Sequence, residues 1–129
     1  MRKQEARREQ LKNFIVGHAR QFDMGVWYAG DSSPTESVAE AIARFEACGT
    51  ACCIGGAVDL LSGFSELDHN ILLAHFGLND EIVDVCNWPE GIRKDYVYAR
   101  FAGNYDKMAA AGCAAIDYYA GGKPPENED

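Results

Sequence analysis

The sequence lacks any long apolar run, and its amino terminus lacks the apolar centre of a secretory signal. The first twelve residues, MRKQEARREQLK, are rich in charge, and no stretch approaches the roughly 18 consecutive apolar residues of a membrane-spanning helix. We therefore expect a cytoplasmic protein that has no membrane partner.

Cysteine is sparse and odd in number, with five residues in 129. A secreted disulfide scaffold carries more cysteines in even number, so this count favours reduced thiols. Phosphate-binding loops are also missing, because Gly55-Gly56 is followed by Ala57-Val58 and not by Gly-Lys-Ser/Thr.

Length and composition bound the domain count. A chain of 129 residues with 47% hydrophobic side chains has the size of one ordinary domain and is too apolar for intrinsic disorder. No internal repeat is visible. We expect a single globular domain over residues 1–122, with a basic first helix at about 3–20, and an acidic flexible tail over 123–129.

The net charge of −8 is unevenly distributed. Residues 1–20 carry six basic and two acidic side chains, or +4, whereas the other 109 residues carry six basic and eighteen acidic side chains, or −12. A body of that charge repels phosphate, so nucleic acid is not an expected partner. It favours basic protein surfaces, and the basic first helix would dock on an acidic face of a partner or of a second copy.

Helical periodicity accounts for most of the chain. Leu11, Phe14 and Ile15 lie on one face of the first helix, and Ser33 and Glu36 have the spacing of a capping box. The fold class we predict is mainly α, a compact domain of about five to seven helices with one short hairpin or extended segment near residues 24–30. The expected helices run over about 3–20, from Pro34 to Gly49, over 51–61 with Thr50 as cap, from Ser65 to Gly77, from Asn79 or Asp80 to Trp88, and over 95–102 and 105–119.

The most unusual string is Cys48-Gly49-Thr50-Ala51-Cys52-Cys53-Ile54-Gly55-Gly56. Its Cys-x3-Cys spacing is compatible with zinc, but His69 and His75 fall on different helical faces. A thiol in the first turn of a helix is a candidate nucleophile, since the helix dipole favours the thiolate. Free cysteines also pack as small hydrophobes. We favour packing, and expect no catalytic residue, no metal and no cofactor.

A second expectation concerns structure around this string. It should form a loop that turns tightly into a buried helix over which two tryptophans pack. The residues of this structural motif are Trp27, Cys48, Gly49, Thr50, Cys53, Gly56 and Trp88. Tyr118 and Tyr119 cannot both face the core from one helix, so at least one of them should be exposed and mark a contact surface.

Several short motifs occur in a recognisable order. They are Phe22-Asp23-Met24-x-x-Trp27, Cys48-Gly49-Thr50-Ala51-x-Cys53-Ile54-x-Gly56, Phe76-Gly77-Leu78 and Trp88-Pro89, followed by an alanine-rich helix. This order resembles a group of small uncharacterised proteins from bacteriophage and bacterial genomes over residues 22–120. The resemblance places Cys48 and Cys53 as the family's cysteines and Cys52 as an extra one. It implies a phage or mobile-element context, hence a host-cell cytoplasm, and no reaction.

The favoured function is therefore binding. We expect a non-enzymatic accessory protein of phage type that binds and modulates or inhibits a host protein, such as a component of a defence system. Its partner would be a host or phage protein, and homo-oligomers are compatible with this function.

Two alternatives stay open. An oligomeric protein that sequesters a small molecule or nucleotide signal would need basic or amide donors around a pocket. The body has one basic cluster in its sequence that offers them: Arg93, Lys94, Arg100 and Lys107. A cysteine- or zinc-dependent enzyme is the third and least favoured class.

Overall fold

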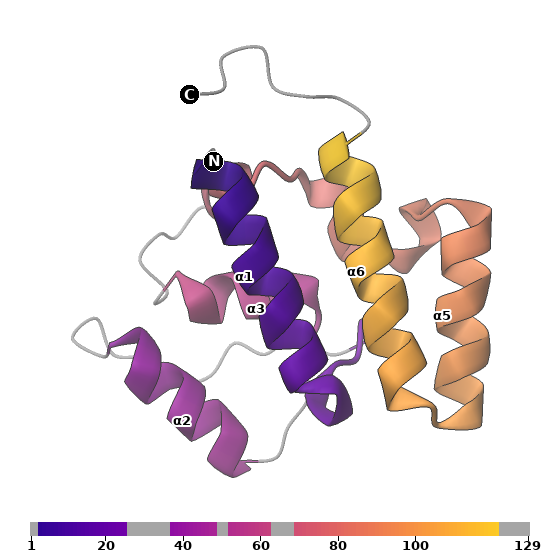
Figure 1. Ribbon diagram of the computed structural model, residues 1–129, viewed down its shortest axis with the longest axis horizontal. Coiled ribbons are helices and arrows are strands. Elements are labelled where there is room, and N and C mark those ends of the chain that lie inside the picture. Colours follow the sequence, from indigo (N-terminus) through magenta and orange to yellow (C-terminus); the bar gives the residue numbers. More distant parts are fainter. Residues whose placement is uncertain (1–2, 26–36, 49–51, 63–68, 122–129) are drawn as a thin grey trace.

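In the computed structural model, the first helix packs against the third and the last helices (Figure 1). The structure describes residues 3–25, 37–48, 52–62 and 69–121. Within them it has six α-helices: α1 (Lys3–Gly17), α2 (Val38–Cys48), α3 (Ile54–Leu61), α4 (His69–His75), α5 (Glu90–Ala102) and α6 (Tyr105–Gly121). Three 3-10 turns complete it: η1 (Ala19–Gln21), η2 (Asp80–Val83) and η3 (Val85–Asn87). The mainly α prediction is confirmed.

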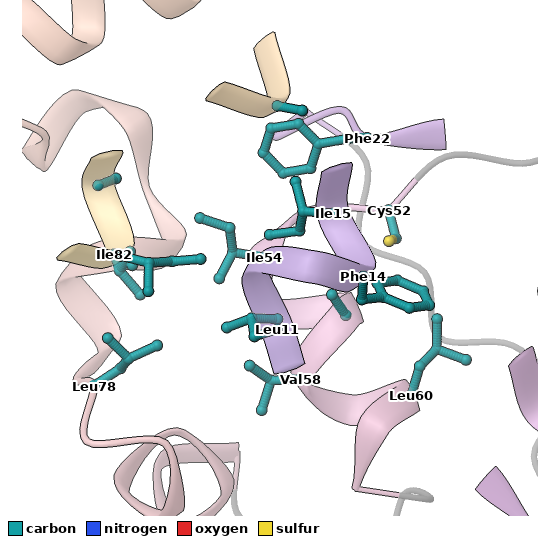
Figure 2. Close-up of a cluster of buried hydrophobic side chains, with 14 of the residues drawn as sticks. Leu11, Phe14, Ile15, Phe22, Cys52, Ile54, Val58, Leu60, Leu78 and Ile82 are labelled. Carbon is teal, nitrogen blue, oxygen red and sulfur yellow. The ribbon is translucent and has the colours of Figure 1, made fainter. Parts of the chain in front are cut away.

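The core lies between α1, α3 and α6. In Figure 2, Leu11 and Ile15 of α1 face Ile54 and Val58 of α3, and all four side chains are buried. α6 packs along the other side of α1, and α5 packs beside α6 at the edge of the molecule (Figure 1). None of the helices in the described ranges is long and apolar enough to cross a membrane.

Three basic side chains of the first helix make contacts within the fold. Arg7 and Arg8 donate to the carbonyls of His75 and Phe76 at 3.0 and 3.2 Å, so they satisfy the carboxyl end of α4. Lys12 donates to Asp117 of α6 at 2.9 Å. Arg7, Arg8 and Lys12 therefore help to hold α1 against α4 and α6.

Two helix starts differ from the prediction. α2 begins at Val38, and its capping box is Ser37–Glu40, in which Glu40 N–H donates to Ser37 Oγ and Ser37 N–H donates to Glu40 Oε1. α3 begins at Ile54 and its cap is Cys53, not Thr50. Both boundaries follow from the same requirement, a side-chain acceptor for the free amides of the first turn.

Other boundaries shift for local reasons. α1 ends at Gly17 and the chain continues as η1, so the predicted helix over 3–20 is two elements. The predicted fifth helix is two 3-10 turns capped by Asn79 and Asp84, whose side chains each accept from a backbone amide two residues on. α5 starts at Glu90, directly after Pro89, since proline is tolerated where a helix begins.

The ends of two elements agree with the prediction. Gly77 and Gly103 adopt left-handed φ values of 71° and 68°, the conformation that glycine provides at little cost after a helix. The segment near residues 24–30 is described only to Gly25, where Met24 and Gly25 form a turn. The rest of that segment lies outside the described residues, and so do the predicted tail and Trp27, Ser33, Glu36, Gly49 and Thr50.

Candidate functional site

The described part of the cysteine string is built into the core. Cys52 is buried and forms an isolated parallel bridge with Phe22, in which Cys52 N–H donates to Gln21 and Asp23 N–H donates to Cys52, at 2.7 and 2.9 Å. Cys53 is the cap of α3, and its Sγ accepts from Gly56 N–H at 3.4 Å. The string therefore ties the segment before Met24 to the central helix, and both Cys53 and Gly56 are buried. Cys48 is the last residue of α2.

Burial also determines the protonation of these thiols. It raises the pKa of Cys52 to about 12, and the neighbouring Cys53 adds to the rise. Burial raises the pKa of Cys53 as well, although the amides of the first turn of α3 oppose it. A raised pKa favours the protonated thiol at neutral pH, so Cys53 caps the start of α3 as a neutral group.

His18 makes its contacts outside the cysteine string. His18 stacks on Phe14 with ring centroids 4.3 Å apart, and its Nε2 lies 2.6 Å from Glu46. No three Cys, His, Asp or Glu side chains within the described ranges are arranged to hold a metal ion.

The four residues of the basic cluster are separated in the structure. Arg93 donates to the Cys86 carbonyl at 3.5 Å, and Lys94 pairs with Glu90 on the outer surface of α5. Arg100 and Lys107 line two different hollows on opposite flanks of α5. These four side chains are close in the sequence but do not converge on one site that could bind a phosphate group.

A polar network fixes the turn at Met24. Arg100 Nε and Nη2 donate to the two carboxylate oxygens of Asp23 at 3.3 and 3.4 Å, and Gly25 N–H donates to Asp23 Oδ1 at 2.8 Å. The hydroxyl of Tyr96 accepts from Met24 N–H at 2.8 Å and donates to Asp23 Oδ1 at 3.3 Å. Burial is the main cause that raises the pKa of Tyr96 to about 12, so this hydroxyl keeps its proton.

Two aromatic side chains, Trp88 and Phe22, pack against Tyr96 of that network. Trp88 is buried, donates from Nε1 to the Ile82 carbonyl at 2.8 Å, and meets Tyr96 edge to face with centroids 5.5 Å apart. Phe22 meets the other side of Tyr96 at 6.2 Å. These contacts pack η2, α5 and the turn at Met24 against one another.

Tyr96 also lines a hollow of about 660 Å³, which we call the Phe101 groove. Its walls are largely apolar, and at its rim the side chain of Phe101 is 87% exposed. The groove is lined by Met24, Gly25, Val83, Asp84, Val85, Tyr96, Val97, Arg100 and Phe101.

The charge around the Phe101 groove is mostly negative. Asp84 is exposed at its edge, and Asp80 and Glu81 are exposed on the adjoining turn η2. Arg100 is the one basic residue among the lining residues, and it is already paired with Asp23. The groove therefore offers apolar contact area beside carboxylates that form no salt bridge with another described residue.

Sequence reasoning missed Phe101. Tyr96 and Ala99 are the buried residues of α5, so Phe101 lies on the opposite face of this helix. Of the two adjacent tyrosines, Tyr118 is 53% exposed, which confirms that at least one of them is exposed, while Tyr119 donates to the Asn87 carbonyl at 2.6 Å. Comparison with known protein families, with curated proteins and with solved structures gave no match.

Proposed function

We propose that the protein acts by binding another protein, and that the Phe101 groove is its docking site. The observation that carries this proposal is a phenylalanine left 87% exposed at the rim of an apolar groove. Contiguous apolar surface on a soluble domain marks interaction sites, and here an exposed aromatic ring adjoins an apolar groove. Aromatic and arginine side chains in preformed pockets are also the residues that contribute most to protein interfaces.

The groove suits a partner segment with an apolar anchor and positive charge. The apolar side chain would enter between Val85, Val97 and Phe101, and the carboxylates of Asp80, Glu81 and Asp84 would attract the basic groups beside it. The body charge of −12 favours the same kind of surface. That the partner is a host protein stays a prediction from the resemblance.

A phosphate-bearing small ligand finds less support. Such a ligand would need several convergent donors, whereas Arg93, Lys94, Arg100 and Lys107 are dispersed and three of them have partners within the chain. The buried, protonated thiols of Cys52 and Cys53 likewise favour a binding role over cysteine chemistry.

The test is capture of partners from a lysate of the expressing host with matched surface variants. Phe101→Glu removes the apolar anchor surface and adds negative charge, and Tyr118→Glu makes the same change at an exposed tyrosine of α6. A protein retained by the wild type and by Tyr118→Glu should be lost with Phe101→Glu, since truncating a central aromatic costs about 2 kcal/mol, or roughly thirtyfold in Kd. Equal retention by all three proteins would refute the proposal.

A further inference from the structure

The other flank of α5 carries a second groove, which we call the Tyr98 groove. It has a volume of about 570 Å³ and runs between the antiparallel helices α5 and α6. At its edge Tyr98 is 68% exposed. The lining residues are Ile92, Asp95, Tyr98, Ala99, Ala102, Asn104, Lys107, Ala110, Ala111 and Ala114.

The two charged side chains in this groove have no ion-pair partner within the described part of the chain. Asp95 and Lys107 are both exposed, and neither belongs to any of the salt bridges between described residues. Asp95 precedes the turn at Gly103 by eight residues and Lys107 follows it by four. With a helical rise of about 1.5 Å per residue, the acid and the base are therefore offset by roughly 6 Å along the groove. Tyr98 lies between them.

We propose that the Tyr98 groove is the contact surface for a second copy of this chain, in a dimer with two-fold symmetry. A surface that carries one unpaired acid and one unpaired base is complementary to itself, because a two-fold axis that brings Asp95 onto the partner's Lys107 also brings Lys107 onto the partner's Asp95. The alanines of α5 and α6 allow the two helix pairs to approach closely, and Tyr98 fills the space near the axis.

The overall charge does not oppose this contact strongly. The groove holds one positive and one negative side chain, so it has no net charge of its own. Repulsion between the remaining charges of two chains is screened beyond about 8 Å at physiological salt. The apolar area supplies the affinity, and the two ion pairs select this partner and this orientation.

The dimer would leave the Phe101 groove open on both chains, since the two grooves lie on opposite flanks of α5. Such a dimer presents two docking sites at a fixed separation and would bind a paired partner with avidity.

Charge exchange between two variants tests the proposal. Asp95→Lys alone and Lys107→Asp alone each place like charges across both contacts, so each should self-associate at least about tenfold more weakly than the wild type. Mixed together, the two variants should form a heterodimer, because the lysine introduced in one chain then faces the aspartate introduced in the other. Asp106→Lys makes the same charge change as Asp95→Lys outside the groove and should leave the dimer intact.

The readout is sedimentation equilibrium or native mass spectrometry from micromolar to millimolar protein, with circular dichroism to confirm that each variant is folded. A wild type that stays monomeric throughout overturns the proposal, as does a dimer that both single variants retain. Two folded, monomeric variants that do not associate with each other overturn it as well. Phe101→Glu separates this proposal from the proposed function, since it should abolish partner binding and leave the dimer unchanged.

Discussion

The contact between Phe22 and Gly112 gives the sharpest prediction for the scaffold. Phe22 is buried, and its ring lies so close to α6 that a Cβ added at Gly112 would be 2.7 and 2.9 Å from Cζ and Cε2 of the ring. A glycine in the middle of a helix normally costs about 1 kcal/mol relative to alanine. Here the missing side chain of Gly112 leaves room for the ring of Phe22.

Gly112→Ala should therefore destabilise the protein despite the better helix propensity of alanine. The overlap with an immobile ring costs about 2 kcal/mol, and the propensity gain returns about 1 kcal/mol. The net loss is about 1 kcal/mol, or roughly 4 °C in Tm for a domain of this size. Urea unfolding followed by circular dichroism measures it.

Two controls test whether the loss of stability in Gly112→Ala comes from the contact with Phe22. Gly91 is also helical, but nothing lies within 4 Å of its added Cβ, so Gly91→Ala should be neutral or stabilising. The Phe22→Leu substitution replaces the ring with a shorter aliphatic side chain. In that background Gly112→Ala should become neutral or stabilising, with a coupling free energy of about 1–2 kcal/mol between the two sites. If Gly112→Ala raised stability in the wild type, the proposed wedge between Phe22 and α6 would be wrong.

Three further predictions follow from individual contacts. Arg8→Ala removes the donor to the Phe76 carbonyl and should lower the free energy of unfolding by about 1 kcal/mol. It should also speed amide exchange in α4 more than in α6, and unchanged exchange would mean that α1 does not hold α4. Alkaline pH should destabilise the fold, because Cys52, with its pKa raised to about 12, keeps its proton in the native state while the unfolded thiol loses it above about pH 8.5. The stability that it contributes is complete below about pH 8.5 and falls by up to about 1.4 kcal/mol per pH unit toward pH 12; Cys52→Ala should flatten this slope, and identical slopes would contradict the assignment. In iodoacetamide labelling read by peptide mass spectrometry, exposed Cys86 should react faster than buried Cys52 and Cys53, whereas similar rates would show that the two core thiols are accessible.

Local signals in the sequence were sufficient for much of the fold. The break at Gly103-Asn104 and the stop at Gly77 were predictable because a left-handed residue after a helix is a backbone requirement that glycine meets by itself. The face of α1 with Leu11, Phe14 and Ile15 was equally clear from its spacing.

Features that depend on distant partners were not predictable. The positive charge of α1 suggested an external partner, yet Arg7 and Arg8 bind carbonyls 68 residues away in the sequence. Cys53 replaced Thr50 as the cap because the position of the helix start, set by the bridge between Phe22 and Cys52, leaves sulfur as the available acceptor.

The grooves were hidden from sequence reasoning for the same reason. Phe101 and Tyr98 lie in a helix whose inner face is Tyr96 and Ala99, so their exposure depends on where η2, η3 and α6 pack. The four basic residues from Arg93 to Lys107 looked like one cluster along the chain, and the packing of α5 on α6 distributes them over different surfaces.

The most direct measurement of the central claim is amide chemical-shift mapping with a peptide selected from a random display library against the wild-type protein. The selected peptides should combine an apolar anchor with lysine or arginine. Their addition should shift the amides around Met24, Val85 and Phe101, and Phe101→Glu should abolish these shifts while Tyr118→Glu retains them. Shifts confined to surfaces outside the Phe101 groove, or unchanged in Phe101→Glu, would contradict the assignment of this groove as the docking site.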